Sequence, residues 1–220
     1  MTIDNDTFER WLEITFTRPE LDWTLDEEKF VCEQKPENEI ACFERVFGDP
    51  FTTFELITDE EINRGLWLIL GESSDFMWVV LKPPVPWSDR KRVIDLIPTF
   101  FESFMVDRCD EHLSHLDRQG QGGRPLNSIC YMWWDIFPTW GQSDETGTSE
   151  SDSAMLSCME RILAIKHIAC QENALHGLGH WHMHYPDVVA RIVDAYLARN
   201  PDLSEELKRY ALNARGGCMH

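Results

Sequence analysis

The segment ALHGLGHWHMHYPDVVARIVDAYL, residues 174–197, decides the fold class predicted for this chain. Its second half carries apolar residues at the spacing of one helix face: Val188, Val189, Ile192, Val193, Tyr196 and Leu197. Pro186 favours a helix start there, because proline is well tolerated in the first helical turn. The first half predicts another helix, which begins near Ile168 and reaches His182. The segment therefore predicts two helices joined by a short turn.

The same apolar spacing recurs along most of the remaining chain. Together with capping residues, it predicts helices over residues 5–16, 36–48, 58–71, 88–116, 126–140, 155–165 and 204–215. Thr58 and Glu61 form a capping box, and Ser88 and Ser204 are expected to cap their helices, as are Asn5 and Asp6. Pro98 predicts a kink near residue 97. The fold class that follows is all-α.

Four segments fit this pattern less well. Residues 20–35 are acidic, and we expect a connection whose Leu21, Trp23, Leu25 and Phe30 reach the core. Residues 76–81 suit a buried strand or a helix, and the lack of partner strands favours a short helix or an extended connector. The glycines of residues 120–125 predict a turn. The polar, acidic residues 141–153 predict a mobile loop within a single domain covering residues 1–220.

Composition sets the compartment that we expect. The seven cysteines are scattered and include no CxxC pair, and the first residues are acidic where a signal peptide would be basic. Both features favour a reducing, cytoplasmic location. The longest apolar run, residues 76–81, is far shorter than the ~20 residues of a membrane helix. We therefore expect no membrane insertion.

The net charge is strongly negative. The chain has 39 acidic and 20 basic residues, a formal charge of -19, and residues 1–61 alone contain 18 Asp or Glu and 5 Lys or Arg. Such a surface repels phosphate backbones and attracts basic partners. It can also serve solubility alone. We expect no nucleic-acid binding, and a basic protein is the partner that the charge favours.

The order of helices adds a resemblance. Residues 154–215 resemble the end of a HEAT or armadillo-type array, and the ALHGLGHW stretch is similar to a helix of bacterial proteins of that kind. The resemblance implies an α-solenoid, a right-handed stack of antiparallel helix pairs in which each pair covers the apolar face of its neighbour. It also implies an interaction scaffold. No repeat period recurs in residues 1–150.

Histidines cluster in the same stretch, at positions 176, 180, 182 and 184. If residues 172–184 are one helix, Glu172, His176, His180 and His184 lie on one side at steps of four. Two histidines at that spacing can offer both imidazoles to one metal ion. The metal candidates are therefore His176, His180 and His184. Zinc would need further ligands from the types available nearby or in the tail: Glu172, Cys170, Cys218 and His220.

The histidine cluster also suits two roles that involve no metal. Gly177 and Gly179 would let a neighbouring helix approach closely, and His176 and His180 would then be hydrogen-bonding residues at a helix crossing. The second such role is a pH-sensitive contact. The cysteines are expected to be buried as small apolar residues. Cys170 lies near the histidines, but no motif supports a Cys/His nucleophile.

The sequence thus favours a non-enzymatic, cytoplasmic, acidic protein that binds a protein partner and needs no cofactor. A scaffold, a regulator and an immunity-type protein that neutralises a basic partner all suit this description. The alternative is a metal-dependent enzyme, with zinc as the expected metal, whose site lies at residues 176–184.

Overall fold

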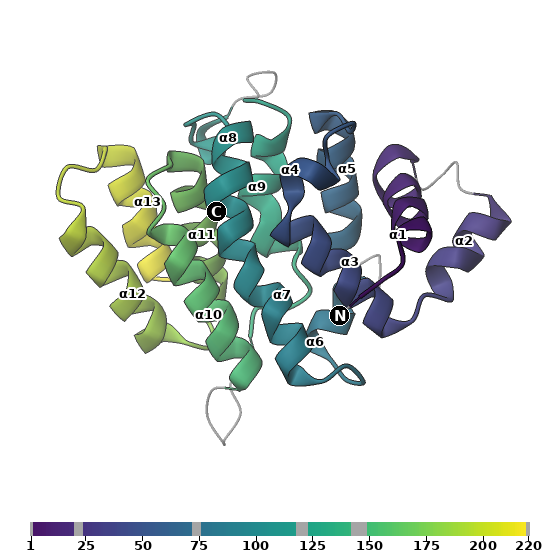
Figure 1. Ribbon diagram of the computed structural model, residues 1–220. Helices are drawn as coiled ribbons and strands as arrows, with labels where there is room; N and C mark the ends of the chain where they lie inside the picture. Colours follow the sequence, from purple (N-terminus) through teal and green to yellow (C-terminus); the bar gives the residue numbers. More distant parts are fainter. Residues whose placement is uncertain (1, 20–23, 72–75, 118–122, 142–148, 219–220) are drawn as a thin grey trace.

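The computed structural model describes residues 2–19, 24–71, 76–117, 123–141 and 149–218, and these ranges contain helices and no strand (Figure 1). The all-α fold class is therefore confirmed. The helical segments are α1 (Asn5–Leu12), a π-helical turn (Glu13–Thr17), α2 (Leu25–Cys32), α3 (Pro36–Gly48), α4 (Pro50–Thr53), α5 (Asp59–Leu70), α6 (Trp78–Leu81), α7 (Trp87–Phe100), a second π-helical turn (Phe101–Met105), α8 (Val106–Arg108), a 3-10 turn (Ser114–Leu116), α9 (Leu126–Ile136), α10 (Glu150–Leu163), α11 (Ile168–Trp181), α12 (Pro186–Arg199) and α13 (Glu205–Arg215).

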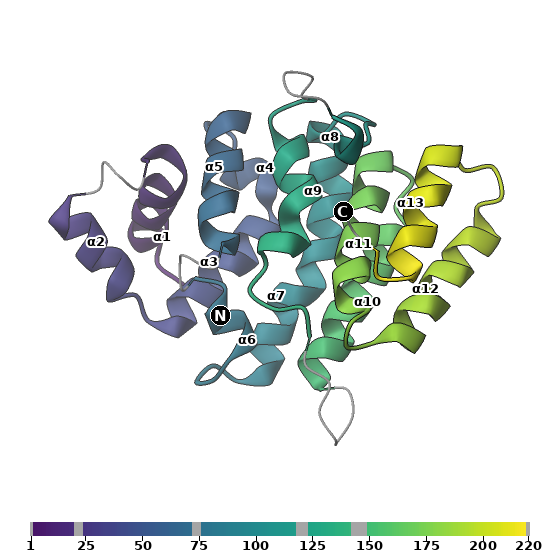
Figure 2. The same ribbon diagram turned by 180° about the vertical axis from the view of Figure 1, so that it is seen from behind.

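The helices follow one another across the molecule, from α1 and α2 at one end to α12 and α13 at the other (Figures 1 and 2). Buried apolar side chains form one connected cluster that runs from Phe8 to Ala214. Helix α11 lies inside it and packs against α9, α10 and α13. Every residue from Ala169 to Gly179 is buried, so the polar side chains of this helix lie in the core.

Capping residues and apolar spacing predicted most helices correctly. Thr58 accepts a hydrogen bond from the backbone N–H of Glu61, whose carboxylate in turn accepts from the backbone N–H of Thr58, as the capping box predicts. Of the two structures considered for residues 76–81, a strand and a short helix, the structure has the helix, over residues 78–81. Trp133 and Trp134 of α9 are fully buried, as expected of core aromatic residues.

The expectation for residues 20–35 was wrong. Residues 25–32 form a helix, because Thr24 and Glu27 make a second capping box that stabilises its first turn. Leu25 is 83% exposed and does not reach the core. Phe30 does pack against the core, as expected. Leu21 and Trp23 lie outside the described residues.

Several helix ends also differ from the prediction. Helix α9 ends at Ile136 and not at Trp140, and α10 begins at Glu150, so residues 150–153 of the expected loop are helical. Asp4 caps α1 in place of Asn5 or Asp6, and α7 begins at Trp87, directly after Pro86, so Ser88 is not its cap. Pro98 lies inside α7, and a π-helical turn follows it. The helical run stops at Arg108, far short of residue 116.

A contact with α9 accompanies this early stop. Cys109 adopts an extended backbone, and the side chain of Asn127 then holds the next residue: it accepts from the backbone N–H of Asp110 at 2.9 Å and donates to its carbonyl at 3.0 Å. These two bonds replace the partners that Asp110 would have had in a longer helix.

Two remaining predictions fall partly outside the described ranges. Of residues 141–153, positions 142–148 are not described, and Ser149 caps α10 by accepting from the backbone N–H of Asp152. Of residues 120–125, positions 120–122 are not described. Among the described helices, none combines the length and the apolarity that crossing a membrane requires.

Candidate metal centre

The candidate site lies between α9 and α11, which pack closely because α11 has a glycine at the contact. A Cβ atom at Gly177 would lie 2.6 Å from Cγ of Trp134, closer than real contacts allow. Hydrogen bonds fix the same pair of helices: Asn173 accepts from the indole N–H of Trp134 at 3.0 Å and donates to the carbonyl of Cys130 at 2.5 Å. The close approach of helices expected at Gly177 is therefore confirmed.

Three potential metal ligands meet at this contact: Asp135 of α9, and His176 and His180 of α11. Their ligand atoms all lie within 4.8 Å of one another. Nε2 of His180 lies 3.2 Å from Nε2 of His176 and 3.1 Å from Oδ1 of Asp135, and Nε2 of His176 lies 4.0 Å from the same oxygen. Metal–ligand bonds of ~2.0–2.1 Å in a tetrahedral site place ligand atoms about 3.3 Å apart. Two of the three distances match, and the third requires a movement of under about 1 Å.

The protonation state of His176 suits a ligand. Burial, together with the neighbouring His180 and His115, lowers the pKa of His176 to about 3. The imidazole is therefore neutral near pH 7, the form in which histidine binds a metal ion.

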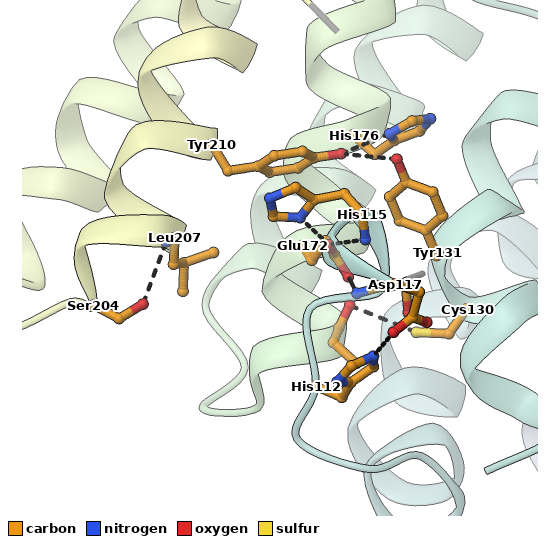
Figure 3. A network of polar contacts seen from close by, with 12 residues as sticks. His112, His115, Asp117, Cys130, Tyr131, Glu172, His176, Ser204, Leu207 and Tyr210 are labelled. Carbon is orange, nitrogen blue, oxygen red and sulfur yellow. Dashed lines mark hydrogen bonds and ion pairs between the residues drawn. The ribbon is translucent and has the colours of Figure 1, made fainter. Parts of the chain in front are cut away.

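The opposite nitrogen of His176 is held by Tyr210 of α13. Its Nδ1 lies 2.7 Å from the Tyr210 hydroxyl, which donates to the hydroxyl of Tyr131 at 3.5 Å (Figure 3). Burial raises the pKa of Tyr210, so this hydroxyl stays neutral. When the Tyr210 hydroxyl donates to Tyr131, its oxygen can accept from Nδ1–H of His176. That arrangement leaves Nε2 without a proton and with a lone pair facing His180 and Asp135.

The rings of the two histidines are enclosed by aromatic side chains. The ring of Tyr131 lies 4.5 Å from that of His176, and Trp140 stacks on His180 at 5.1 Å with an interplanar angle of 15°. The side chain of His176 is 9% exposed, against 23% for His180 and 32% for Asp135. The group is therefore packed on the His176 side and open to solvent on the Asp135 side.

Glu172, one turn before His176, binds the 3-10 turn at residues 114–116. Its buried carboxylate accepts from the backbone N–H groups of Ser114 and His115, at 2.7 and 3.0 Å, and lies 2.5 Å from Nδ1 of His115 (Figure 3). The His115 ring stacks on Tyr210 at 4.3 Å. Glu172 thus fixes the 3-10 turn against α11 and is not a ligand.

His184 does not join the three-residue group, contrary to its place among the metal candidates. The prediction needed α11 to continue to residue 184, but the helix ends at Trp181 and a turn follows, in which the N–H of His184 bonds to the carbonyl of Trp181. Pro186 separates this turn from α12, since the residue before a proline, Tyr185, avoids the helical region. Cys218 is exposed and its thiol contacts the carbonyl of Gly216, while His220 lies outside the described residues.

Asp135 was missed in the sequence. It is the one charged residue between Leu126 and Trp140, in an otherwise apolar helix. A lone carboxylate in such a helix was a signal of a buried polar role, but its proximity to the histidines depends on how α9 and α11 pack.

The chain was also compared with known proteins. No protein-family model, curated protein or solved structure matches it. The function is therefore argued from the geometry of this site.

Proposed function

We propose that this protein binds one divalent transition-metal ion, of which zinc is the representative, through Asp135, His176 and His180. The observation that supports this is the convergence of three ligand atoms on one point, with the buried histidine neutral and its far nitrogen hydrogen-bonded. Two imidazoles and one carboxylate are a common donor set for zinc and for iron(II).

Three protein ligands leave at least one coordination position for water. Sites of this composition are typical of metal-dependent enzymes, whereas structural zinc sites usually have four protein ligands. The open Asp135 side gives solvent access to that position. We therefore propose that the protein is a metal-dependent enzyme of the class in which the metal activates a bound water.

Metal content and calorimetric titration test the proposal. Protein stripped with a chelator and titrated with Zn²⁺ is expected to bind one equivalent, and His176→Ala and Asp135→Asn are expected to weaken that binding at least tenfold. His184→Ala is the matched control, because this histidine lies just beyond α11 and outside the group. Equal affinity in the His176, Asp135 and His184 variants would reject the site, provided that circular dichroism shows all three folded.

A second candidate function has one specific observation in its favour. Acidic side chains of the first 61 residues are largely exposed, including Asp4, Asp6, Glu9, Glu13, Asp26, Glu28, Glu33, Glu37, Asp49, Glu55 and Glu60. We propose that this acidic surface captures a basic protein, on a single domain built as an α-solenoid. Complementary charge accelerates such encounters and is screened by salt. A pull-down in which partners are retained equally at low and high salt would contradict electrostatic capture.

A further inference from the structure

A pocket opens near the end of the molecule formed by α1 and α2, and it shares no residue with the metal centre (Figure 1). One side is formed by α1 and the π-helical turn that follows it. The other side is formed by residues 45–57, from the end of α3 through α4 to the segment before α5. Its volume is about 390 Å³, within the range of ~300–1,000 Å³ of pockets that hold ligands. The pocket is therefore large enough to hold a side chain of a partner.

The inner part of the pocket is apolar. Phe8 and Leu12 line it from successive turns of α1 and are buried, and Ile57 lines it from the other side and packs against the core. Leu56 also lines the pocket but is 94% exposed. The apolar surface thus continues from the buried ring of Phe8 out to a leucine in solvent. A partner side chain in the pocket would remove this surface from water.

Carboxylates border the pocket on both sides. Glu9 and Glu13 come from α1 and its π-helical turn, and Asp49 and Glu55 come from the two ends of α4. All four are exposed. Glu13 forms an ion pair with Arg18 at 3.1 Å, whereas within the described part of the chain Glu9, Asp49 and Glu55 form none. Three carboxylates are thus open to the cations of a partner.

Of the described residues that line the pocket, Arg45 is the one that is positively charged, and contacts within the protein already hold it. Its guanidinium lies 3.7 Å from the centre of the Phe8 ring and donates to the side chain of Asn5 at 3.1 Å. Because four lining residues are acidic and one is basic, the pocket attracts cations and repels anions.

We propose that this pocket binds a short segment of a basic protein in which an apolar side chain is flanked by lysine or arginine residues. The apolar side chain lies between Leu12 and Leu56. The flanking cations lie near Glu9 on one side and near Asp49 and Glu55 on the other. This inference rests on the second proposed function, the capture of a basic protein, and adds the place of contact and the class of segment recognised. Exposed ion pairs alone are weak, so the buried apolar side chain supplies the selectivity.

Nuclear magnetic resonance titration of the nitrogen-15-labelled wild-type protein tests the inference with synthetic peptides. The probe is a pentapeptide with a central leucine between two pairs of lysines, and the control peptide has serine in place of the leucine. The leucine peptide is expected to shift the amide signals of residues 8–17 and 45–57. It is expected to bind at least about fivefold more tightly than the serine peptide, because the leucine leaves water on binding. Added salt is expected to weaken both peptides.

Two exposed leucines provide a matched pair of variants. Leu56→Ser removes the leucine at the pocket and is expected to weaken the leucine peptide at least about threefold, with no change for the serine peptide. Leu25→Ser removes a leucine of α2 that is 83% exposed and lies outside the pocket, and it is expected to change neither peptide. Because both side chains lie in solvent, both variants are expected to fold, which circular dichroism checks.

Two double variants test the charges. Glu9→Gln with Asp49→Asn removes two carboxylates of the pocket, and Glu28→Gln with Glu37→Gln removes two exposed carboxylates outside it. Both change the net charge by the same amount. The first is expected to weaken the leucine peptide by about two- to tenfold, and the second is expected to have a smaller effect.

The outcomes separate this inference from the proposed capture of a basic protein. Equal binding of the two peptides, signal shifts outside residues 8–17 and 45–57, or equal losses in the pocket and control variants would overturn the pocket and leave electrostatic capture standing. Shifts at the pocket that depend on protein concentration without peptide would identify a second copy as the occupant and overturn it too. If neither peptide binds and the pull-down also shows no salt-sensitive partner, both proposals are wrong.

Discussion

Replacing Tyr210 by phenylalanine tests the supporting contact of the metal centre. The Tyr210 hydroxyl lies 2.7 Å from Nδ1 of the buried His176. When Nε2 binds a metal ion, the proton of the imidazole must be on Nδ1, so the metal-bound state needs this acceptor. The free imidazole can instead place its proton on Nε2, where His180 and Asp135 are within reach. The loss of the hydroxyl therefore weakens the bound state more than the free state.

The expected loss of zinc affinity follows from the free-energy cost of a buried N–H group without an acceptor. Leaving one N–H group without a partner costs ~1–3 kcal/mol, and loss of a contact behind a metal ligand typically weakens affinity by about 10–100-fold. Calorimetric titration of the chelator-stripped protein with Zn²⁺ is expected to show a decrease in that range for Tyr210→Phe.

A second buried tyrosine supplies the control. The Tyr196 hydroxyl donates to the side chain of Gln171 at 3.1 Å, also on α11 but away from the metal ligands. Tyr196→Phe is expected to lower the free energy of unfolding by about 0.5–1.5 kcal/mol without a change in zinc affinity. If Tyr210→Phe binds zinc as tightly as the wild type, or if both variants lose affinity equally, then Tyr210 does not support a metal ligand.

Three further predictions concern the ligands and their packing. Asp135→Asn is expected to reduce zinc affinity at least tenfold with little change in the melting temperature, and unchanged affinity would exclude this carboxylate as a ligand. Gly177→Ala is expected to lower the free energy of unfolding by about 1–3 kcal/mol in urea titrations, because the added Cβ would overlap Trp134. Gly48→Ala is the control: its added Cβ would lie 3.7 Å from the nearest atom, so the free energy of unfolding is expected to change little. In metal-free protein, His176 binds a proton near pH 6.5 when unfolded but only near pH 3 when folded, so its contribution to stability falls as pH decreases between these values. Urea titrations at pH 7 and 4.5 should show a loss about 1–3 kcal/mol larger for the wild type than for His176→Gln, and equal losses would contradict the shift.

The helices were largely readable from the sequence because their signals are local. The capping pair of Thr58 and Glu61, and Pro186 at the start of α12, act within one turn of the chain and need no tertiary contact. Helix α2 was missed because its apolar residues make no clear stripe and Leu25 faces solvent. Its capping residues, Thr24 and Glu27, were nevertheless present in the sequence.

Only part of the site could be predicted from the sequence, because local patterns give the spacing within one helix but not the packing between helices. The spacing of His176 and His180 is a property of one helix, and the structure brings their Nε2 atoms to 3.2 Å. Asp135 reaches them through the packing of α9 on α11, which no local pattern encodes. His184 lies outside this group because the spacing argument continued the helix beyond Trp181, where α11 ends.

The burial of the cysteines was expected from their character as small apolar residues. The structure confirms it for Cys42, Cys109, Cys130, Cys158 and Cys170, whereas Cys218, close to the end of the described chain, is exposed.

Anomalous X-ray diffraction at the zinc absorption edge, from crystals grown with Zn²⁺, tests the central claim most directly. The account predicts one strong peak between α9 and α11, about 2.0–2.2 Å from Nε2 of His176, Nε2 of His180 and an oxygen of Asp135. A zinc-containing crystal with no peak at this point, or with its zinc held by His182, His184 or Cys218 instead, would contradict it.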